Sequence, residues 1–106
     1  MKRLNLLLIA CAMLYIGHVQ ADPSTRQIKL FSVNCAQCHV GGNRFIPTMG
    51  RAKDWVERNR RGEDALVKSV MQGLGGMPPS GYCSACDEAD IRVLVRLVAG
   101  LKEGQQ

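Results

Sequence analysis

The stretch Cys35-Ala36-Gln37-Cys38-His39 carries the most specific information in this chain of 106 residues. Its two thiols are three positions apart, so at the end of a helix both can bond to the vinyl groups along one edge of a porphyrin. The imidazole of His39 would then lie beneath the iron. A Cys-x-x-Cys-His run is typical of covalent haem attachment. We therefore expect one haem here, with Cys35 and Cys38 as the linked cysteines and His39 as an iron ligand.

Two other kinds of site can be built from the same residue types. A Cys-x-x-Cys pair can serve as a redox dithiol, and the pair Cys35 and Cys38 could combine with Cys83 and Cys86 in a four-cysteine zinc site. The 44 residues between the two pairs far exceed the gap of a zinc ribbon. The histidine that directly follows the first pair favours haem over both alternatives.

The second ligand of the iron has to come from a methionine, because no other histidine follows the motif. The candidates are Met49, Met71 and Met77. Met71 has the spacing of a helical core residue, and Met49 lies in a loop where a methionine can simply fill space. Met77 is favoured, because the glycines Gly75-Gly76 before it and the prolines Pro78-Pro79 after it constrain the loop that carries its thioether.

Hydrophobic periodicity predicts helices and no strands in the rest of the chain. We expect a first helix capped by Ser24 that ends at Gly41-Gly42, a short helix over 52–58, and a third from Glu63 to Gly73. A last helix should begin near 84–87 and end at about Gly100. The glycine- and proline-rich segment 75–81 should be neither helix nor strand. The sequence therefore predicts an all-α fold of three to five helices wrapped around one covalently attached haem.

The first 21 residues have the order of a secretory signal: a positive start, an apolar stretch from Leu4 to about Gly17, and small residues before Asp22. We expect residues 1–21 to be a cleaved signal peptide and residues 22–106 to be the exported, periplasmic monohaem domain. The apolar stretch is too short to span a membrane comfortably, so no stable membrane span is expected after cleavage. One alternative is a lipobox ending at Cys11, which would make the protein lipid-anchored, and another is that the apolar stretch is retained as an N-terminal anchor.

The charge of the expected mature domain is mildly basic, with 12 basic and 9 acidic residues. No basic run is interleaved with aromatic residues, so nothing suggests binding to nucleic acid. One basic segment is either a solvated face or a surface that steers an acidic partner towards the haem edge. It contains Arg51, Lys53, Arg58, Arg60 and Arg61. Arg44 is either exposed or paired with a haem propionate.

The order of several features along the chain resembles that of the class I c-type cytochromes. The features are Phe31, the Cys35–His39 motif, Pro47, the Met77-Pro78 pair and a final amphipathic helix. The additional pair Cys83 and Cys86 is similar to that of the cytochrome c5 subgroup of bacteria. The resemblance covers essentially the whole expected mature chain.

This resemblance implies a role for each residue of the site. Cys35 and Cys38 would hold haem c through thioethers, with His39 as the proximal and Met77 as the distal ligand of the iron. The Pro47 carbonyl would accept the other imidazole proton of His39 and so fix its orientation. Trp55 would belong to a core that includes the haem face, with its indole N–H available to a propionate.

Two features bear on packing beside the haem. We expect Cys83 and Cys86 to form a disulfide, which closes a small loop, contributes only about 2 kcal/mol through chain entropy and braces the Met77 loop. A catalytic dithiol and the zinc site remain alternatives for this pair. Gln27 replaces a glycine that is usual in the family, and Leu97 replaces a usual aromatic residue, which leaves the packing of the first helix against the last helix open.

The implied function is reversible one-electron transfer between protein redox partners, by a protein that is not an enzyme. A His/Met pair fills both axial positions of the iron and raises its reduction potential relative to other ligand sets. The alternative is a haem-bearing electron-transfer subunit of a larger periplasmic oxidoreductase.

Overall fold

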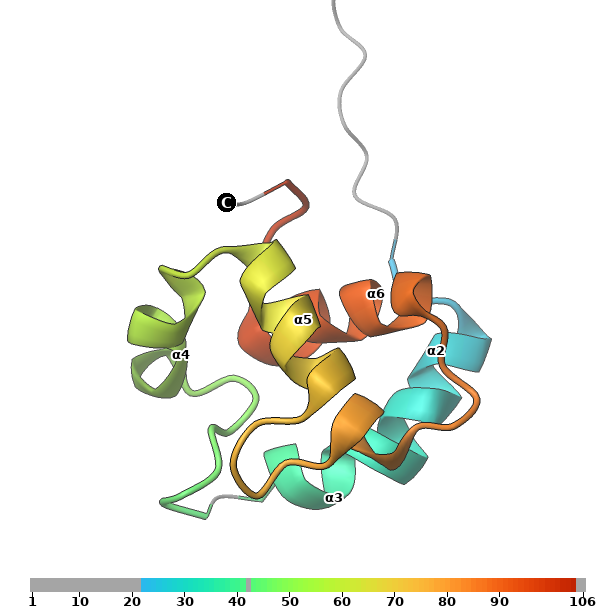
Figure 1. The fold of residues 1–106 in the computed structure, drawn as a ribbon, viewed down its shortest axis with the longest axis horizontal. Coiled ribbons are helices and arrows are strands. Elements are labelled where there is room, and N and C mark those ends of the chain that lie inside the picture. Colours follow the sequence, from blue (N-terminus) through green and yellow to red (C-terminus); the bar gives the residue numbers. More distant parts are fainter. Residues whose placement is uncertain (1–21, 42, 105–106) are drawn as a thin grey trace, which may run out of the picture.

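The computed structural model describes residues 22–41 and 43–104, and the all-α prediction is confirmed within them (Figure 1). The elements are α2 (Thr25–Leu30), the π-helical turn η1 (Phe31–Cys35), α3 (Ala36–His39), α4 (Ala52–Asn59), α5 (Glu63–Gln72), the 3₁₀ turn η2 (Pro79–Tyr82) and α6 (Glu88–Ala99). None of the helices in these residues is long and apolar enough to cross a bilayer. The expected signal peptide, residues 1–21, lies outside the described residues together with Cys11.

The first helical stretch begins with a capping box at Ser24. The Gln27 N–H donates to the Ser24 hydroxyl at 3.1 Å, and the Ser24 N–H donates to the Gln27 side chain at 2.9 Å. Helix α2 then continues without a break through η1 into α3. The π-helical turn was not predicted, because one wider turn hardly changes the spacing of apolar residues. The turn ends at Cys35, the first residue of the attachment motif, so it sets the direction of α3 relative to α2.

A polar cluster joins α2 to α6 where the two helices cross. Arg26 Nη1 donates to both carboxylate oxygens of Asp90, at 2.7 and 2.8 Å, and Gln27 Nε2 donates to Asp90 Oδ1 at 3.2 Å. The Asp90 side chain is only 6% exposed. Gln27 therefore contributes a hydrogen bond between α2 and α6, at a position where a glycine would have allowed the two helices to approach closely. Leu97 does not take part in this cluster and lines a separate cavity together with Pro23.

A second ion-pair cluster joins the start of α5 to α6. Glu63 is buried, with 2% of its surface exposed. Arg96 binds it with two donors, Nε to Oε2 at 2.7 Å and Nη2 to Oε1 at 2.8 Å, and Arg92 Nη1 adds a third bond to Oε1 at 2.9 Å. Arg92 also binds Asp64 and Glu88 at the surface. Buried charge at this point is thus fully paired and links two helices that are distant in sequence.

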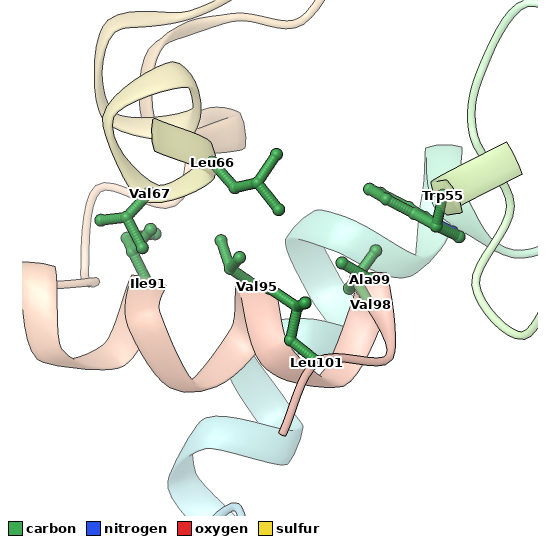
Figure 2. Close-up of a cluster of buried hydrophobic side chains, with 8 residues drawn as sticks. All are labelled: Trp55, Leu66, Val67, Ile91, Val95, Val98, Ala99 and Leu101. Carbon is green, nitrogen blue, oxygen red and sulfur yellow. The ribbon is translucent and has the colours of Figure 1, made fainter. Parts of the chain in front are cut away.

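The hydrophobic core lies between α5, α6 and α4. In Figure 2, Leu66 and Val67 on α5 face Ile91 and Val95 on α6, and Trp55 on α4 lies at the other end of the cluster. The remaining members are Val98, Ala99 and Leu101. Most of these side chains also line the large cavity described below, so the core is arranged around that cavity.

The element boundaries agree with the sequence prediction except in one segment. Asp87 caps α6 by accepting from the Asp90 N–H at 2.8 Å, which confirms the expected start of the last helix. The segment 75–81 was expected to contain no helix, but its end belongs to η2. This 3₁₀ turn forms because Pro78 and Ser80 carbonyls accept the N–H groups of Gly81 and Cys83, both at 3.0 Å.

The ion pairs of Asp90 with Arg26 and of Glu63 with Arg96 predict that the protein loses stability in acid. Hydrogen bonds from Arg96 chiefly lower the pKa of Glu63, and those from Arg26 chiefly lower the pKa of Asp90. The unfolded chain then binds more protons than the folded protein in acid, so the free energy of unfolding should be constant above about pH 5 and fall below about pH 4. Urea midpoints measured at a series of pH values test this. Arg26→Gln should reduce the fall, and a midpoint that stays constant down to about pH 3 would contradict the prediction.

Candidate haem site

One large cavity brings the residues of the predicted site together. Its volume is about 630 Å³, within the range of roughly 300–1,000 Å³ that is usual for ligand sites. Cys35, Cys38, His39 and Met77 all line it. The rest of the lining is mostly apolar and comes chiefly from the 45–47 loop, α4, α5, the 74–82 segment and α6. Such a lining suits a large, flat, apolar group with few polar contacts.

The attachment motif lies at the junction of η1 and α3. Cys35 is half-buried and Cys38 is exposed, and both side chains reach the cavity. Burial raises the pKa of the Cys35 thiol, and the neighbouring Cys38 raises it further. Redox-active dithiols depend on a lowered thiol pKa. The environment of Cys35 therefore disfavours the alternative of a redox dithiol.

The imidazole of His39 is oriented by the loop that follows it. His39 Nδ1 donates to the Pro47 carbonyl at 2.7 Å, as the resemblance implies. Because a carbonyl can only accept, this bond places a proton on Nδ1, and in the neutral tautomer with that proton Nε2 carries the free lone pair. The Met49 N–H donates to the His39 carbonyl at 2.8 Å and holds the same loop from the other side. His39 is thus prepared to coordinate a metal ion through Nε2.

Met77 lies at the end of a tight two-residue turn after α5. The Leu74 and Met77 backbones exchange hydrogen bonds of 2.9 and 3.0 Å, and Gly75 between them has φ +57°, a conformation that other residues rarely adopt. Gly73 has φ +81°, and a Cβ there would lie 2.9 Å from the Met77 carbonyl oxygen. The sequence pattern identifies Gly73 only as the residue that ends the helix before it, not as one that contacts the Met77 backbone. The glycines together fix the path of the chain that carries the thioether.

The other two candidate methionines occupy different places. Met49 and Met71 are half-buried and pack against the hydrophobic core. Within the described residues, Met77 is the methionine that lines the cavity. The methyl group of Met77 lies beside Gly81, where an added Cβ would be 3.4 Å away. The geometry therefore favours the same methionine as the sequence does.

The expectation for Trp55 is wrong in one respect. Trp55 is buried and lines the cavity, but its indole N–H donates to the Thr48 carbonyl at 2.9 Å. It therefore holds the loop before α4 instead of being available to a propionate. The sequence could not show this, because it depends on how residues 43–51 fold back over α4. Arg44 is exposed, and its guanidinium lies 4.5 Å from the ring centroid of Phe45.

Cys83 and Cys86 form a disulfide in the structure, with their Cα atoms 5.4 Å apart. Cys83 is buried, and the Cys86 N–H donates to its carbonyl at 3.2 Å. This pair joins the end of η2 to the approach to α6, so it braces the segment that follows Met77. The disulfide uses two of the four thiols that the zinc alternative requires, which argues against that alternative. The described residues contain no group of three or more cysteine, histidine or acidic side chains arranged to hold a metal ion.

Two polar residues of the cavity were not singled out by the sequence analysis as part of the site. Arg58 in the last turn of α4 and Arg61 after it both line the cavity. The sequence placed them in a basic segment of undetermined role. Helical spacing alone could not distinguish them from their solvated neighbours, because the cavity is formed by several elements.

Comparison with known proteins agrees with this geometry. The family model described as "Cytochrome C oxidase, cbb3-type, subunit III" matches residues 25–98. Cytochrome c5 of Ectopseudomonas mendocina is 28% identical over 74 residues, which cover 68% of this chain and 85% of that protein. Cytochrome c6 of Porphyra purpurea is 40% identical over 86 residues, which cover 76% of this chain and 77% of that protein.

The fold has a solved counterpart. A chain of the "Crystal structure of electron transfer complex of nitrite reductase with cytochrome c" matches with a TM-score of 0.64 and 34% identity, over 73% of this chain and 94% of that one. The family model, the relatives and the helices arranged around one cavity agree with one another. The chain therefore belongs to the class I c-type cytochromes, a family whose members carry one covalently attached haem c.

Proposed function

We propose that this protein is an exported, periplasmic one-electron carrier that holds haem c through Cys35 and Cys38, with His39 and Met77 as ligands of the iron. The hydrogen bond from His39 Nδ1 to the Pro47 carbonyl is the observation that carries the proposal. It leaves Nε2 as the nitrogen available to a metal, in the cavity that Met77 also lines. Relatives named cytochrome c5 and cytochrome c6 support electron transfer as the function.

In this proposal the protein side chains hold and orient the haem, and they take no part in chemical steps of their own. Cys35 and Cys38 would anchor the group at the end of η1, and Pro47 keeps the His39 ring in one orientation. The glycine turn and the disulfide restrain the segment on either side of Met77. When bound, the haem iron supplies the reversible gain and loss of one electron. Protein ligands on both sides leave no open position for a substrate, so we propose a carrier and not an enzyme.

The mouth of the cavity provides the surface for electron exchange. Phe45, Leu74 and Tyr82 line it and are 75%, 61% and 81% exposed. They come from the loops after α3, after α5 and at η2. An apolar rim of this kind suits brief contact with a protein redox partner. The matched solved structure, an electron transfer complex of nitrite reductase with cytochrome c, supports a partner of that class.

A second candidate function is that of a haem-bearing subunit in a larger oxidoreductase. The description of the matching family, which names an oxidase subunit, favours this candidate. Purification from the native membrane and periplasmic fractions under mild conditions would distinguish the two. A free carrier should elute at the size of the domain, whereas a subunit should co-purify with a large partner in a fixed ratio.

Intact-mass measurement together with a visible spectrum tests the main proposal. The mature protein is expected to begin at Asp22, to carry the added mass of one haem after denaturation, and to show haem absorption bands. A colourless protein with the mass of its amino acids alone would overturn the proposal. A haem that is lost on denaturation would contradict attachment through Cys35 and Cys38.

A further inference from the structure

The peptide group between Pro47 and Thr48 is hydrogen-bonded at both of its ends. Its carbonyl, which belongs to Pro47, accepts from His39 Nδ1 at 2.7 Å. Its N–H, which belongs to Thr48, donates to Asp54 Oδ2 at 2.9 Å. One planar amide, whose C–N bond has partial double-bond character, therefore connects a carboxylate to the imidazole. The three groups form a hydrogen-bonded relay from Asp54 to His39.

The surroundings of Asp54 favour a strong effect of its charge on this relay. The Asp54 side chain is only 19% exposed, so water screens it incompletely. Hydrogen bonds to an ionised acceptor are about twice as strong as neutral ones, and bonds in a chain polarise one another. The bond from His39 Nδ1 lies at the short end of the usual range of roughly 2.7–3.2 Å. The carboxylate should therefore make the Pro47 carbonyl a stronger acceptor.

The ordinary roles of an acidic residue at a helix start do not account for this contact. Asp54 is the third residue of α4, where a carboxylate suits the helix dipole and can accept the N–H of the N-cap residue, Arg51. The Arg51 N–H instead donates to the Thr48 carbonyl at 3.1 Å. The Arg51 guanidinium lies 3.6 Å from Asp54 Oδ2 and is 42% exposed, so this ion pair is weak. The Thr48 N–H is the closer partner of the carboxylate.

The peptide group that follows is also held at both ends. The Thr48 carbonyl accepts the Trp55 indole N–H at 2.9 Å, and the Met49 N–H donates to the His39 carbonyl at 2.8 Å. Asp54 and Trp55 are neighbours on α4, so one turn of this helix binds both backbone groups of Thr48. The amide of the relay cannot rotate without breaking several of these bonds, which gives the relay a fixed geometry.

We infer that Asp54 is a positioning residue that acts on His39 through the Pro47–Thr48 peptide group and lowers the reduction potential. This inference rests on the proposed function, which makes His39 a ligand of the iron. A stronger acceptor at Pro47 draws the Nδ1 proton towards itself and makes Nε2 more basic. A more basic ligand favours the oxidised iron, which carries one more positive charge than the reduced iron.

The test compares three variants of the full-length holoprotein by spectroelectrochemistry. Asp54→Asn keeps an oxygen that can accept the Thr48 N–H but removes the charge, whereas Asp54→Glu keeps the charge and displaces it by one methylene. We expect Asp54→Asn to raise the equilibrium constant for reduction by about threefold to tenfold, where tenfold corresponds to about 59 mV for one electron. Asp54→Glu should raise it by less. Glu57→Gln is the control on the same helix and should change it far less, because Glu57 is 73% exposed.

A second measurement separates the relay from a charge that acts through space. Nuclear magnetic resonance of the reduced holoprotein gives the chemical shift of the His39 Nδ1 proton, which moves upfield when its hydrogen bond weakens. We expect an upfield shift in both Asp54 variants and none in Glu57→Gln. A changed potential in Asp54→Asn with an unmoved proton resonance would mean a through-space effect and would overturn the inference. If Asp54→Asn does not fold, the resonance in Asp54→Glu decides the question.

The outcomes for the inference and for the proposed function are distinguishable. An unchanged potential and an unchanged Nδ1 resonance in Asp54→Asn, in a protein with covalent haem, would overturn the inference and leave the proposed function intact. A wild-type protein without covalent haem would overturn both.

Discussion

Replacing Met77 with alanine is expected to lower the reduction potential of the holoprotein by on the order of 100 mV or more. A thioether stabilises reduced iron relative to other axial ligands, and alanine offers no ligand atom. Carbon monoxide should then bind to the reduced variant, because one coordination position is no longer held by the protein. The turn before Met77 is built by backbone hydrogen bonds and glycines, so the variant should still fold. Spectroelectrochemistry and a carbon monoxide titration measure both effects.

The other two methionines are matched controls for this prediction. Met49 and Met71 pack against the core and do not line the cavity. Met71→Ala should cost roughly 2 kcal/mol of stability and leave the potential and the lack of carbon monoxide binding unchanged. An unaltered potential in Met77→Ala, or a large change in one of the controls, would remove Met77 from the proposed role.

Replacing Glu63 with alanine is expected to reduce the free energy of unfolding by roughly 3–5 kcal/mol. The substitution would leave Arg96, whose side chain is 18% exposed, without the carboxylate that accepts two of its donors. Arg92 would lose one of its three acidic partners. The loss is large because the Arg96 guanidinium stays partly buried and keeps only the longer contact of 3.7 Å to the half-exposed Glu103. Urea unfolding followed by circular dichroism measures it.

Glu57→Ala provides the comparison at an exposed site. Glu57, like Glu63, forms an ion pair with an arginine, but Glu57 and its partner Arg60 are both at least 70% exposed. Water solvates these charges and screens their attraction, so the cost should be below about 1 kcal/mol. Equal losses for Glu63→Ala and Glu57→Ala would show that burial of the α5–α6 cluster contributes nothing to stability.

Much of the fold and of the candidate site follows from local sequence patterns. Ser24 predicts where the first helix begins, and the start expected near 84–87 for the last helix agrees with the observed cap at Asp87, because a cap depends on hydrogen bonds within a few residues. The glycine and proline spacing predicts the constrained turn at Met77 for the same reason. The attachment motif predicts the chemistry of Cys35, Cys38 and His39, since the three side chains are adjacent on one helix end.

The remaining features depend on residues that are far apart along the chain. The pairing of Glu63 with Arg92 and Arg96 joins α5 to α6, and the hydrogen bonds from α2 to Asp90 join α2 to α6. The sequence shows a polar or amphipathic residue at each position but not which group it meets. Arg58 and Arg61 are the clearest case, because only the packing of α4 beside α5 and α6 makes part of a basic segment the wall of a cavity. Helical periodicity describes one helix at a time, whereas a cavity is a property of several helices together.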